Sequence, residues 1–409
     1  MNEPSAGPPA YGTSRGVESR PTFLVLDPGS RHSLAVVRGI GRAGWQAVVA
    51  GVESRRDALA AASRYCVAYH RIPNPWHAGP PVEAAIRALV ERYRLHGIVM
   101  CSDVTIARLR NLDLGVPMLP ELGEGLDQAI DKLTLQRICA AEGVMYPRTA
   151  SAYSAEWRRL PFPLIVKPRQ TAVATPERVI SRTGASVVHS EFELMSAVRE
   201  LADLGIEPIV QERVGRAFKI NVSFVRRHGT TSFQIAYRVL REHPHEGGLA
   251  ATIETLDPDV GIGALTIQTA QRVCDAAGYA GLANVEFYGQ NDGRMCLIEI
   301  NPRVWGSIGF PEQLGLRPTE RAIHDVLDLP PEKPLSYRAG RRFHRPTLEV
   351  KAFLRPAPIA GSRRDVVLSI RPWDVFDGVS VSDPVPVAVA VRQTVQRGIR
   401  MLARSITRR

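Results

Sequence analysis

The sequence predicts an α/β protein whose N-terminal part is built on a parallel sheet. Residues 22–27 form an apolar strand that ends at a Pro-Gly-Ser turn, residues 33–43 have helical periodicity, and residues 46–50 form the next strand. A second helix and strand follow over residues 83–94 and 97–101. Strands that alternate with helices in this way are typical of a parallel sheet with helices on its faces.

Length and composition indicate a globular protein of two or three domains. The chain has 409 residues, of which 44% are apolar and 23% are charged. No run of about 18 apolar residues is present, which argues against a membrane span. The first 20 residues are rich in Pro, Gly and Ser, which predicts a disordered tail and not a secretion signal. Five cysteines without a close pair favour reduced thiols and a cytoplasmic location.

Polar residues follow two strands of the predicted parallel sheet. Ser30 and Asp103 are expected on the substrate side, because ligands of open parallel sheets bind beyond the carboxyl ends of the strands. Helix capping is the favoured alternative, since Ser and Asp are common N-caps. The GxGxxG fingerprint is missing, which disfavours a nicotinamide-dependent enzyme.

Two carboxylates near residue 290 are the strongest indication of chemistry. Glu299 and Asn301 alternate with isoleucines, so a strand would direct them and Arg303 to one face. Glu286 belongs to a preceding strand, and the Asn-Asp-Gly between the two strands predicts a turn that pairs them. Two carboxylates and an amide oxygen suit Mg²⁺, with Mn²⁺ as the alternative, and an arginine beside them suits a phosphate or carboxylate. The alternative is a hairpin with a solvated charged face.

The order of these residues resembles the metal-binding segment of the ATP-grasp superfamily, which includes biotin carboxylase, D-alanine ligase and carbamoyl phosphate synthetase domains. The resemblance covers residues 21 to 330. Lys132 opens a helical stretch and Lys167 lies in a Leu-Ile-Val-Lys-Pro strand, where the family has its two nucleotide-binding lysines. Only five lysines occur among the 52 basic residues, so a lysine at both positions supports the resemblance against the alternative of two surface lysines.

The resemblance implies roles for further residues. Gln211, Glu212 and Val214 are similar to the hinge that lines the adenine and ribose side of ATP. Arg241 is the candidate for a phosphate contact, and Arg303 would stabilise the transferring phosphoryl group. The two lysines would neutralise phosphate oxygens, and the carboxylates with their neighbouring asparagine would hold the metal.

The activity implied by the resemblance is an ATP-dependent carboxylate–amine ligase. A small-molecule carboxylate would form an acyl phosphate, and an amine, a thiol or another nucleophile would then displace phosphate, with release of ADP and phosphate. Two departures keep a nucleotide-binding regulatory or scaffold protein as the alternative. Residues 169–176 contain no glycine where the family has a glycine-rich phosphate loop. Lys219 replaces an acid or polar residue and is expected to pair with a substrate acid or with Glu212, or to be solvated.

The resemblance also implies the domain organisation. The expected parts are a disordered tail (1–20), a pre-ATP-grasp α/β domain (21–120), an ATP-grasp domain (121–330) with subdomains at 121–205 and 206–330, and a C-terminal appendage (331–409). Short strands are expected at 348–354 and 365–370. The last stretch, 387–409, has the apolar spacing of an amphipathic helix with a basic face, which suits packing on the protein body or contact with an anionic membrane surface.

Two other classes of site are disfavoured. The formal charge of +11 is spread as arginine along the chain without a nucleic-acid-binding motif, which argues against nucleic-acid binding as the main function. His243 and His245 have strand spacing but no third ligand nearby, so exposed loop histidines are favoured over a metal site.

Overall fold

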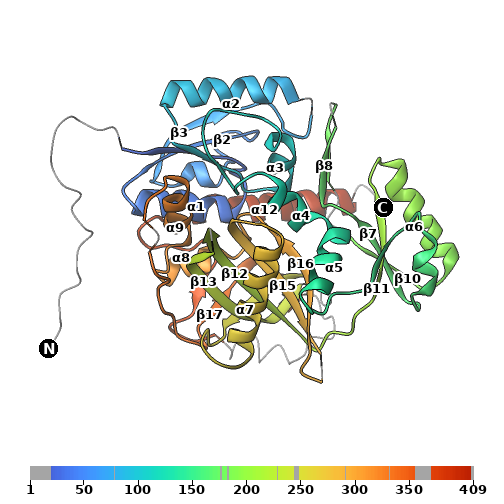
Figure 1. Cartoon of the computed structure of the whole chain (residues 1–409). Coiled ribbons are helices and arrows are strands. Elements are labelled where there is room, and N and C mark those ends of the chain that lie inside the picture. The colour runs from blue at the N-terminus through green and yellow to red at the C-terminus, as the bar shows by residue number, and fades with distance from the viewer. Residues whose placement is uncertain are drawn as a thin grey trace.

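The computed structural model confirms the predicted mixed α/β class. It describes residues 20–77, 79–175, 177–181, 184–227, 229–243, 248–290, 292–330, 332–354 and 370–406. These residues form a parallel sheet at the N-terminus, a small antiparallel sheet, a large and mostly antiparallel sheet, and a two-stranded ribbon (Figure 1). The predicted tail (1–20) lies outside the described residues except for residue 20. The predicted strand at 365–370 lies outside them except for residue 370. His245 is also outside the described residues.

The N-terminal sheet has five parallel strands in the order β3-β2-β1-β4-β5. Its elements are β1 (Thr22–Val25), α1 (Arg31–Arg42), β2 (Gln46–Gly51), η1 (Ala60–Ala62), β3 (Cys66–Arg71), α2 (Gly79–Tyr93), β4 (Gly97–Val99), α3 (Asp103–Leu109) and β5 (Met118–Leu119). Ser30 caps α1 by accepting the N–H of Ser33, which confirms the capping interpretation. The cap of α3 is Ser102, so Asp103 is the first helical residue and its carboxylate remains available for another contact.

The small sheet carries the predicted second lysine and the predicted hinge. Its four strands have the order β10-β7-β11-β6, and α6 contacts three of them. The elements of this part are α4 (Glu124–Ile130), α5 (Lys132–Ala141), β6 (Thr149–Ser151), η2 (Ala155–Arg159), β7 (Leu164–Pro168), β8 (Ala172–Ala174), β9 (Val179–Ser181), β10 (Ser186–Val188), α6 (Glu191–Asp203) and β11 (Pro208–Glu212). Strands β8 and β9 pair only with each other and project from the sheet towards α3 (Figure 1).

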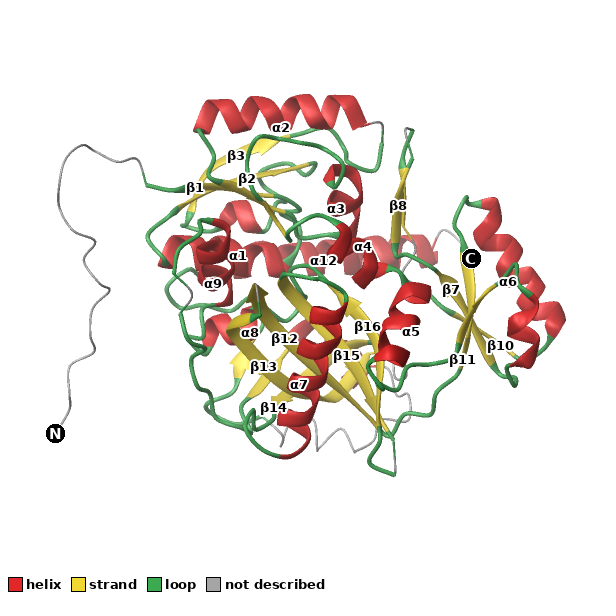
Figure 2. Ribbon diagram, in the orientation of Figure 1, coloured by secondary structure: helices red, strands yellow, loops and turns green. Residues whose placement is uncertain are grey.

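The large sheet has seven strands in the order β16-β15-β12-β13-β14-β17-β18. Figure 2 shows α7 lying across its face. The elements are β12 (Phe218–Arg227), β13 (Thr230–His243), β14 (Leu249–Thr255), α7 (Gly261–Ala276), β15 (Gly281–Gly289), β16 (Met295–Asn301), α8 (Gly309–Gln313) and α9 (Pro318–Val326). One apolar cluster joins α7 to this sheet and to the N-terminal sheet, so the two sheets share a core.

The C-terminal part adds two strands and two described helices. They are β17 (Arg342–His344), α10 (Pro346–Leu354), β18 (Val375–Phe376) and α12 (Val385–Ile406). The strand predicted at 348–354 is wrong, because this segment is the helix α10. Pro346 is the first residue of the helix, and its fixed φ suits that position. Glu349 forms an ion pair with Arg241 of β13, which lies 108 residues earlier in the sequence.

The predicted amphipathic helix is present as α12, and its first half packs on the N-terminal sheet region. Arg392 forms an ion pair with Asp57, and the Nε2–H of Gln393 donates to the Asp57 carbonyl at 2.7 Å. Val389 and Ala390 pack against the core. Side chains from residue 397 onward lie outside the described part, so a membrane contact there stays a prediction. Among the described helices, none combines the length and the apolar character needed to cross a membrane.

Candidate functional site

The two predicted carboxylates face each other across paired strands. Glu286 of β15 stands directly opposite Glu299 of β16, with the predicted turn between the strands, so the predicted pairing is confirmed. Asn301 follows two residues later and donates from Nδ2 to Oε1 of Glu299 at 3.0 Å. A β-bulge leaves Ile298 without a partner, which resets the alternation and lets both Leu297 and Ile300 be buried.

Three lysines from three different elements surround these carboxylates. Lys132 is the buried first residue of α5, and its Nζ donates to the carbonyl of Arg169 at 3.3 Å. Lys167 lies on β7 and Lys219 on β12. Lys219 forms an ion pair with Glu286, which corrects the expectation that it pairs with Glu212 or is solvated. The correction follows from the sheet, because the partner of Lys219 lies on the neighbouring strand β15.

The charges of this cluster perturb one another strongly. Burial, together with the ammonium of Lys132, lowers the pKa of Lys167 to about 8. Burial opposes the charged form of Glu299, but Lys132 and Lys167 outweigh it and hold the pKa of that carboxyl below its ordinary value. At Lys219, burial lowers the pKa of the ammonium, but the neighbouring carboxylate of Glu286 outweighs burial and raises this pKa above its ordinary value. Three ammonium groups against two carboxylates leave an excess of positive charge, which suits an anionic ligand.

Arg303 connects this cluster to the N-terminal sheet. It follows the end of β16, and its Nε donates to Oδ1 of Asp103 at 2.9 Å. His32 of α1 lies near the same guanidinium. Burial and Arg303 lower the pKa of this histidine to about 4, and its neutral ring donates from Nε2 to the carbonyl of Cys101. The contact of Asp103 with Arg303 agrees with the expectation that Asp103 lies on the site side of the sheet.

The predicted hinge residues lie where the small sheet passes into the large one. Gln211 and Glu212 end β11, and Val214 is in the loop before β12. The Nε2–H of Gln211 donates to Oγ1 of Thr149, and Glu212 accepts from Nε of Arg148 at 2.6 Å. These contacts stay within the small sheet and its connecting loop, so the hinge residues form a second group beside the lysine and carboxylate cluster.

Arg241 is not brought to this cluster by any described contact. Its Nε donates to Oε2 of Glu349 at 2.8 Å, and its Nη2 donates to Oγ1 of Thr252. Both partners belong to the region where β13 and β14 meet α10. The described contacts therefore give Arg241 the role of holding α10 against the sheet.

The donor set at the carboxylates fits a hard cation. Glu286, Glu299 and Asn301 offer carboxylate and amide oxygens, and Asn221, opposite Glu286 on β12, has a buried Oδ1 with no hydrogen-bond partner. Within the described residues, no three His, Cys, Asp or Glu side chains gather to hold a metal ion by themselves. Two carboxylates that share a cation with substrate phosphates are the usual arrangement for Mg²⁺, so the residues present fit that ion.

A small cavity lies on one side of this cluster. It measures about 40 Å³, is lined by residues that include Lys132, Glu299 and Asn301, and is bordered by Thr171 and Ala172 at the start of the β8–β9 hairpin. This volume is below that of common ligand pockets, which measure about 300–1,000 Å³. The hairpin that borders the cavity pairs with no other described strand.

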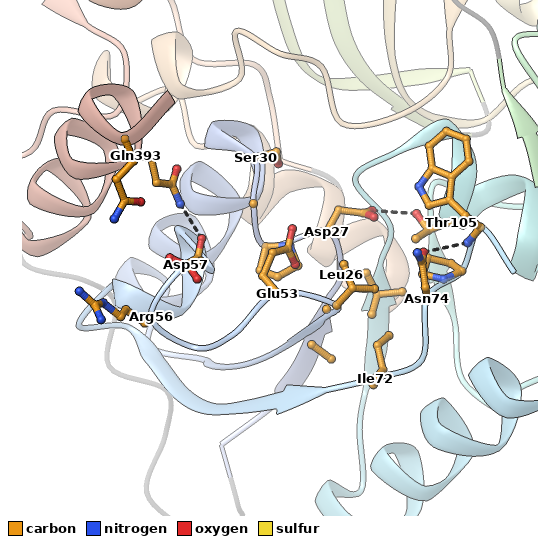
Figure 3. A pocket seen from close by; sticks show the side chains of 18 residues that line it. Leu26, Asp27, Ser30, Glu53, Arg56, Asp57, Ile72, Asn74, Thr105 and Gln393 are labelled. Atoms are coloured by element: carbon orange, nitrogen blue, oxygen red, sulfur yellow. Dashed lines mark hydrogen bonds between the residues drawn. The ribbon is translucent and has the colours of Figure 1, made fainter. Parts of the chain in front are cut away.

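A larger cavity lies at the carboxyl ends of the N-terminal strands. It measures about 670 Å³, and its lining includes Ser30, Asp27 and Glu53 (Figure 3). The sequence predicts Ser30 on this side, whereas Asp27 and Glu53 are not among the predicted site residues. The signal that could have identified both is their position directly after β1 and β2, where parallel-sheet proteins bind ligands.

Known proteins are similar in sequence to about half of this chain. The carbamoyl phosphate synthase large chain of Xylella fastidiosa is 24% identical over 212 residues, and that of Methanoculleus marisnigri is 26% identical over 218 residues. These matches cover 48% and 50% of this chain but only 19% of each relative, so the match spans about a fifth of the relatives' length. No protein-family model matches the sequence.

Solved structures resemble a larger part of the chain. The N5-carboxyaminoimidazole ribonucleotide synthetase of Thermus thermophilus aligns with a TM-score of 0.58 and 19% identity, over 78% of this chain and 81% of that one. The biotin carboxylase of Campylobacter jejuni aligns with a TM-score of 0.59 and 16% identity, over 79% and 74% of the two chains. At these identities the similarity defines the fold.

Proposed function

We propose that this chain, which has the ATP-grasp fold, is an ATP-dependent ligase that joins a small-molecule carboxylate to an amine or another nucleophile. The observation that carries the proposal is the convergence of three of the chain's five lysines on two facing carboxylates. Such a cluster supplies positive charge for phosphate oxygens and hard oxygen ligands for a cation that accompanies them.

The reaction proceeds in two displacements. An oxygen of the substrate carboxylate attacks the γ-phosphorus of ATP, the bond to the β–γ bridging oxygen breaks, and an acyl phosphate and ADP result. The nucleophile then attacks the acyl carbon, loses its proton, and expels inorganic phosphate to leave an amide or a related bond. The protein contributes positioning and charge stabilisation in both steps.

The residues of the cluster divide these tasks. Lys132 and Lys167 bind phosphate oxygens as compact positive charges on buried stems. Arg303, held by Asp103, stabilises charge on the transferring phosphoryl group and on the acyl phosphate. The adenine and ribose of ATP contact the hinge residues Gln211, Glu212 and Val214, an assignment that rests on their resemblance to the hinge of the ATP-grasp family.

Glu286, Glu299 and Asn301 would hold the metal, which would neutralise negative charge on the phosphates. Lys219 forms an ion pair with Oε2 of Glu286, so its ammonium adds positive charge beside these carboxylates.

Hydroxylamine trapping tests the acyl phosphate without knowledge of the natural amine. Purified protein is incubated with Mg·ATP, hydroxylamine and a panel of amino-acid and dicarboxylic acids, and hydroxamate and ADP are measured. The proposal expects one acid class to give both products in equal amounts. Glu299→Ala should lower this turnover by about 100-fold or more, since it removes a carboxylate that acts on the transferring group. Glu83→Ala, which changes an exposed acid of α2, is the matched control and should leave turnover unchanged.

The second candidate is a nucleotide-binding regulatory or scaffold protein. It is favoured by the β8–β9 hairpin, which lacks glycine and packs against α3 where relatives of the family have a glycine-rich loop. Mg·ATP binding without ADP release across the acid panel would support this candidate and contradict the ligase.

A further inference from the structure

The cavity at the carboxyl ends of β1, β2 and β3 is separate from the lysine and carboxylate cluster. Helix α3 contributes to both places, with Thr105 lining this cavity and Asp103 lining the small one. The cavity volume of about 670 Å³ lies in the range of small-molecule sites. Gln393 and Gln396 of α12 complete its wall, so the C-terminal helix closes a site that the N-terminal strands begin.

Two carboxylates stand together inside this cavity, as Figure 3 shows for Asp27 and Glu53. Oδ2 of Asp27 accepts the backbone N–H of Cys101 and the hydroxyl of Thr105, at 3.0 and 2.8 Å. Among the described residues, by contrast, no group donates to the Glu53 carboxylate, and protein atoms cover only its Oε2. A carboxylate oxygen without a protein donor favours a donor from a ligand, and Oε1 is the oxygen of Glu53 that a ligand in the cavity can reach.

The backbone is adapted to keep the Glu53 carboxylate in this position. A Cβ atom at Gly29 would lie 2.5 Å from Oε1 of Glu53, and one at Gly51 would lie 2.8 Å from Oε2. Only glycine leaves room for the carboxylate at both places. Asp27 has a φ of +60°, which is uncommon for a residue with a side chain and is concentrated at functional sites.

The surroundings of the two carboxylates favour a positively charged group. Asp57 also lines the cavity but is paired with Arg392, so Asp27 and Glu53 stand against the single positive side chain of Arg56 in the lining. This small negative balance is unusual in a chain with a formal charge of +11. Trp76 lines the cavity and is 45% exposed, and an exposed indole face attracts cations as well as hydrocarbon.

We propose that this cavity binds an organic cation, with a protonated amino group on Glu53 and Asp27 and its carbon skeleton against Trp76 and Ile72. The ammonium donates to the Glu53 carboxylate through Oε1 and reduces the repulsion between the two carboxylates. This binding site goes beyond the proposed ligase reaction and needs no nucleotide. A neutral polyol could also donate to Glu53, but it would leave the repulsion between the acids uncompensated.

The test compares 1,5-diaminopentane with its neutral isostere 1,5-pentanediol by calorimetric titration of the full chain, without nucleotide and at constant ionic strength. The proposal expects saturable binding of one diamine per chain, at least tenfold tighter than that of the diol. Glu53→Gln should weaken diamine binding at least tenfold, because the carboxylate is lost while the shape is kept. Glu83→Gln, a matched change on α2, should leave diamine affinity unchanged.

A second measurement separates a binding role of Glu53 from a structural one. Since the variant Glu53→Gln removes a charge that repels Asp27, its Tm should equal or exceed that of the wild type. Equal affinity for diamine and diol, no diamine binding at all, or an unchanged diamine affinity in Glu53→Gln would each overturn the proposal. A Tm of Glu53→Gln several degrees below the wild type would overturn it too. Titration with an ATP analogue is run separately, so failure of the nucleotide site is distinguishable.

Discussion

Lysine is scarce in this protein, and its placement is therefore informative at the scale of single residues. Lys132, Lys167 and Lys219 meet at the facing carboxylates, although arginine supplies almost all other positive charge. A guanidinium keeps its proton throughout the ordinary pH range, whereas a buried ammonium can lose it. The choice of lysine makes the charge of the site dependent on pH.

Lys167 should make nucleotide binding sensitive to pH. Burial and Lys132 bring its pKa to about 8 in the free protein, and phosphate oxygens favour its protonated form. Binding should therefore take up a proton, and affinity for an ATP analogue should fall as pH rises above about 8, by up to about tenfold per pH unit. Calorimetry in buffers of different ionisation enthalpy measures both effects.

Lys167→Arg is the matched variant, because an arginine remains charged over the same range. Its analogue affinity should vary less between pH 7 and 9 than that of the wild type. An equally steep fall in the arginine variant would assign the pH dependence to another group.

Local patterns predicted the carboxylate pair, because Glu286, Glu299 and the turn between them lie within one short segment. The same reasoning could not identify the partner of Lys219, which depends on the pairing of β12 with β15. Nor could it find that Arg241 binds Glu349, 108 residues away in the sequence. Contacts of this kind are set by how sheets and helices assemble, and single-sequence patterns contain little of that information.

At the scale of elements, the β8–β9 hairpin borders the small cavity beside the lysine and carboxylate cluster. Ala172 and Val179 of the hairpin pack with Val104 and Ala107 of α3 in a small apolar cluster. The N–H of Val179 also donates to the carbonyl of Trp76 at 3.0 Å. The hairpin is thus held against α3 through apolar contact, at the position where the resemblance implies a glycine-rich loop.

Val179→Ala should loosen this hairpin. The substitution removes two buried methyl groups, and the expected loss is about 1–2 kcal/mol of local stability. Amide hydrogens of β8 and β9 should then exchange about tenfold faster, as measured by mass spectrometry. Val187→Ala, at an exposed position of β10, should leave their exchange unchanged. Unaltered protection in Val179→Ala would show that the apolar cluster does not hold the hairpin.

Prediction of elements succeeded where local signals agreed and failed where tertiary contact decided. The strands β1, β2 and β4 and the helices α1 and α2 match their predicted ranges to within a few residues at each end, and the predicted pairing of the Glu286 and Glu299 strands is present. Residues 348–354 have β-branched and apolar residues typical of a strand, but the structure has α10 there. Pro346 and the ion pair of Glu349 with β13 favour the helix over the local pattern.

At the scale of the whole molecule, the segment before α12 contacts helices and loops of the N-terminal sheet region. Asp383, just before α12, is buried and binds Arg38 of α1 at 2.8 Å. It also accepts the hydroxyl of Ser63 and the backbone N–H of Arg64, at 2.7 and 2.9 Å. Because α12 completes the cavity of the N-terminal sheet, this buried pair supports a binding site as well as the fold.

Asp383→Ala should destabilise the protein strongly. It leaves the buried Arg38 without its counter-charge, and the removal of one partner from such a pair costs about 3–5 kcal/mol. Urea unfolding measures the loss. Glu191→Ala breaks an ion pair with Arg158 in which both side chains are 60% exposed, and this control should cost under about 1 kcal/mol. Similar midpoints for both variants would contradict a central role for Asp383.

Calorimetric titration with Mg²⁺ and a non-hydrolysable ATP analogue tests the proposed nucleotide site. We expect one saturable site per chain in the wild type that depends on Mg²⁺. We also expect weaker binding in Lys167→Ala and loss of the Mg²⁺ dependence in Glu299→Gln. Absence of analogue binding in the wild type, or equal binding with and without Mg²⁺ that Lys167→Ala leaves unchanged, would contradict it.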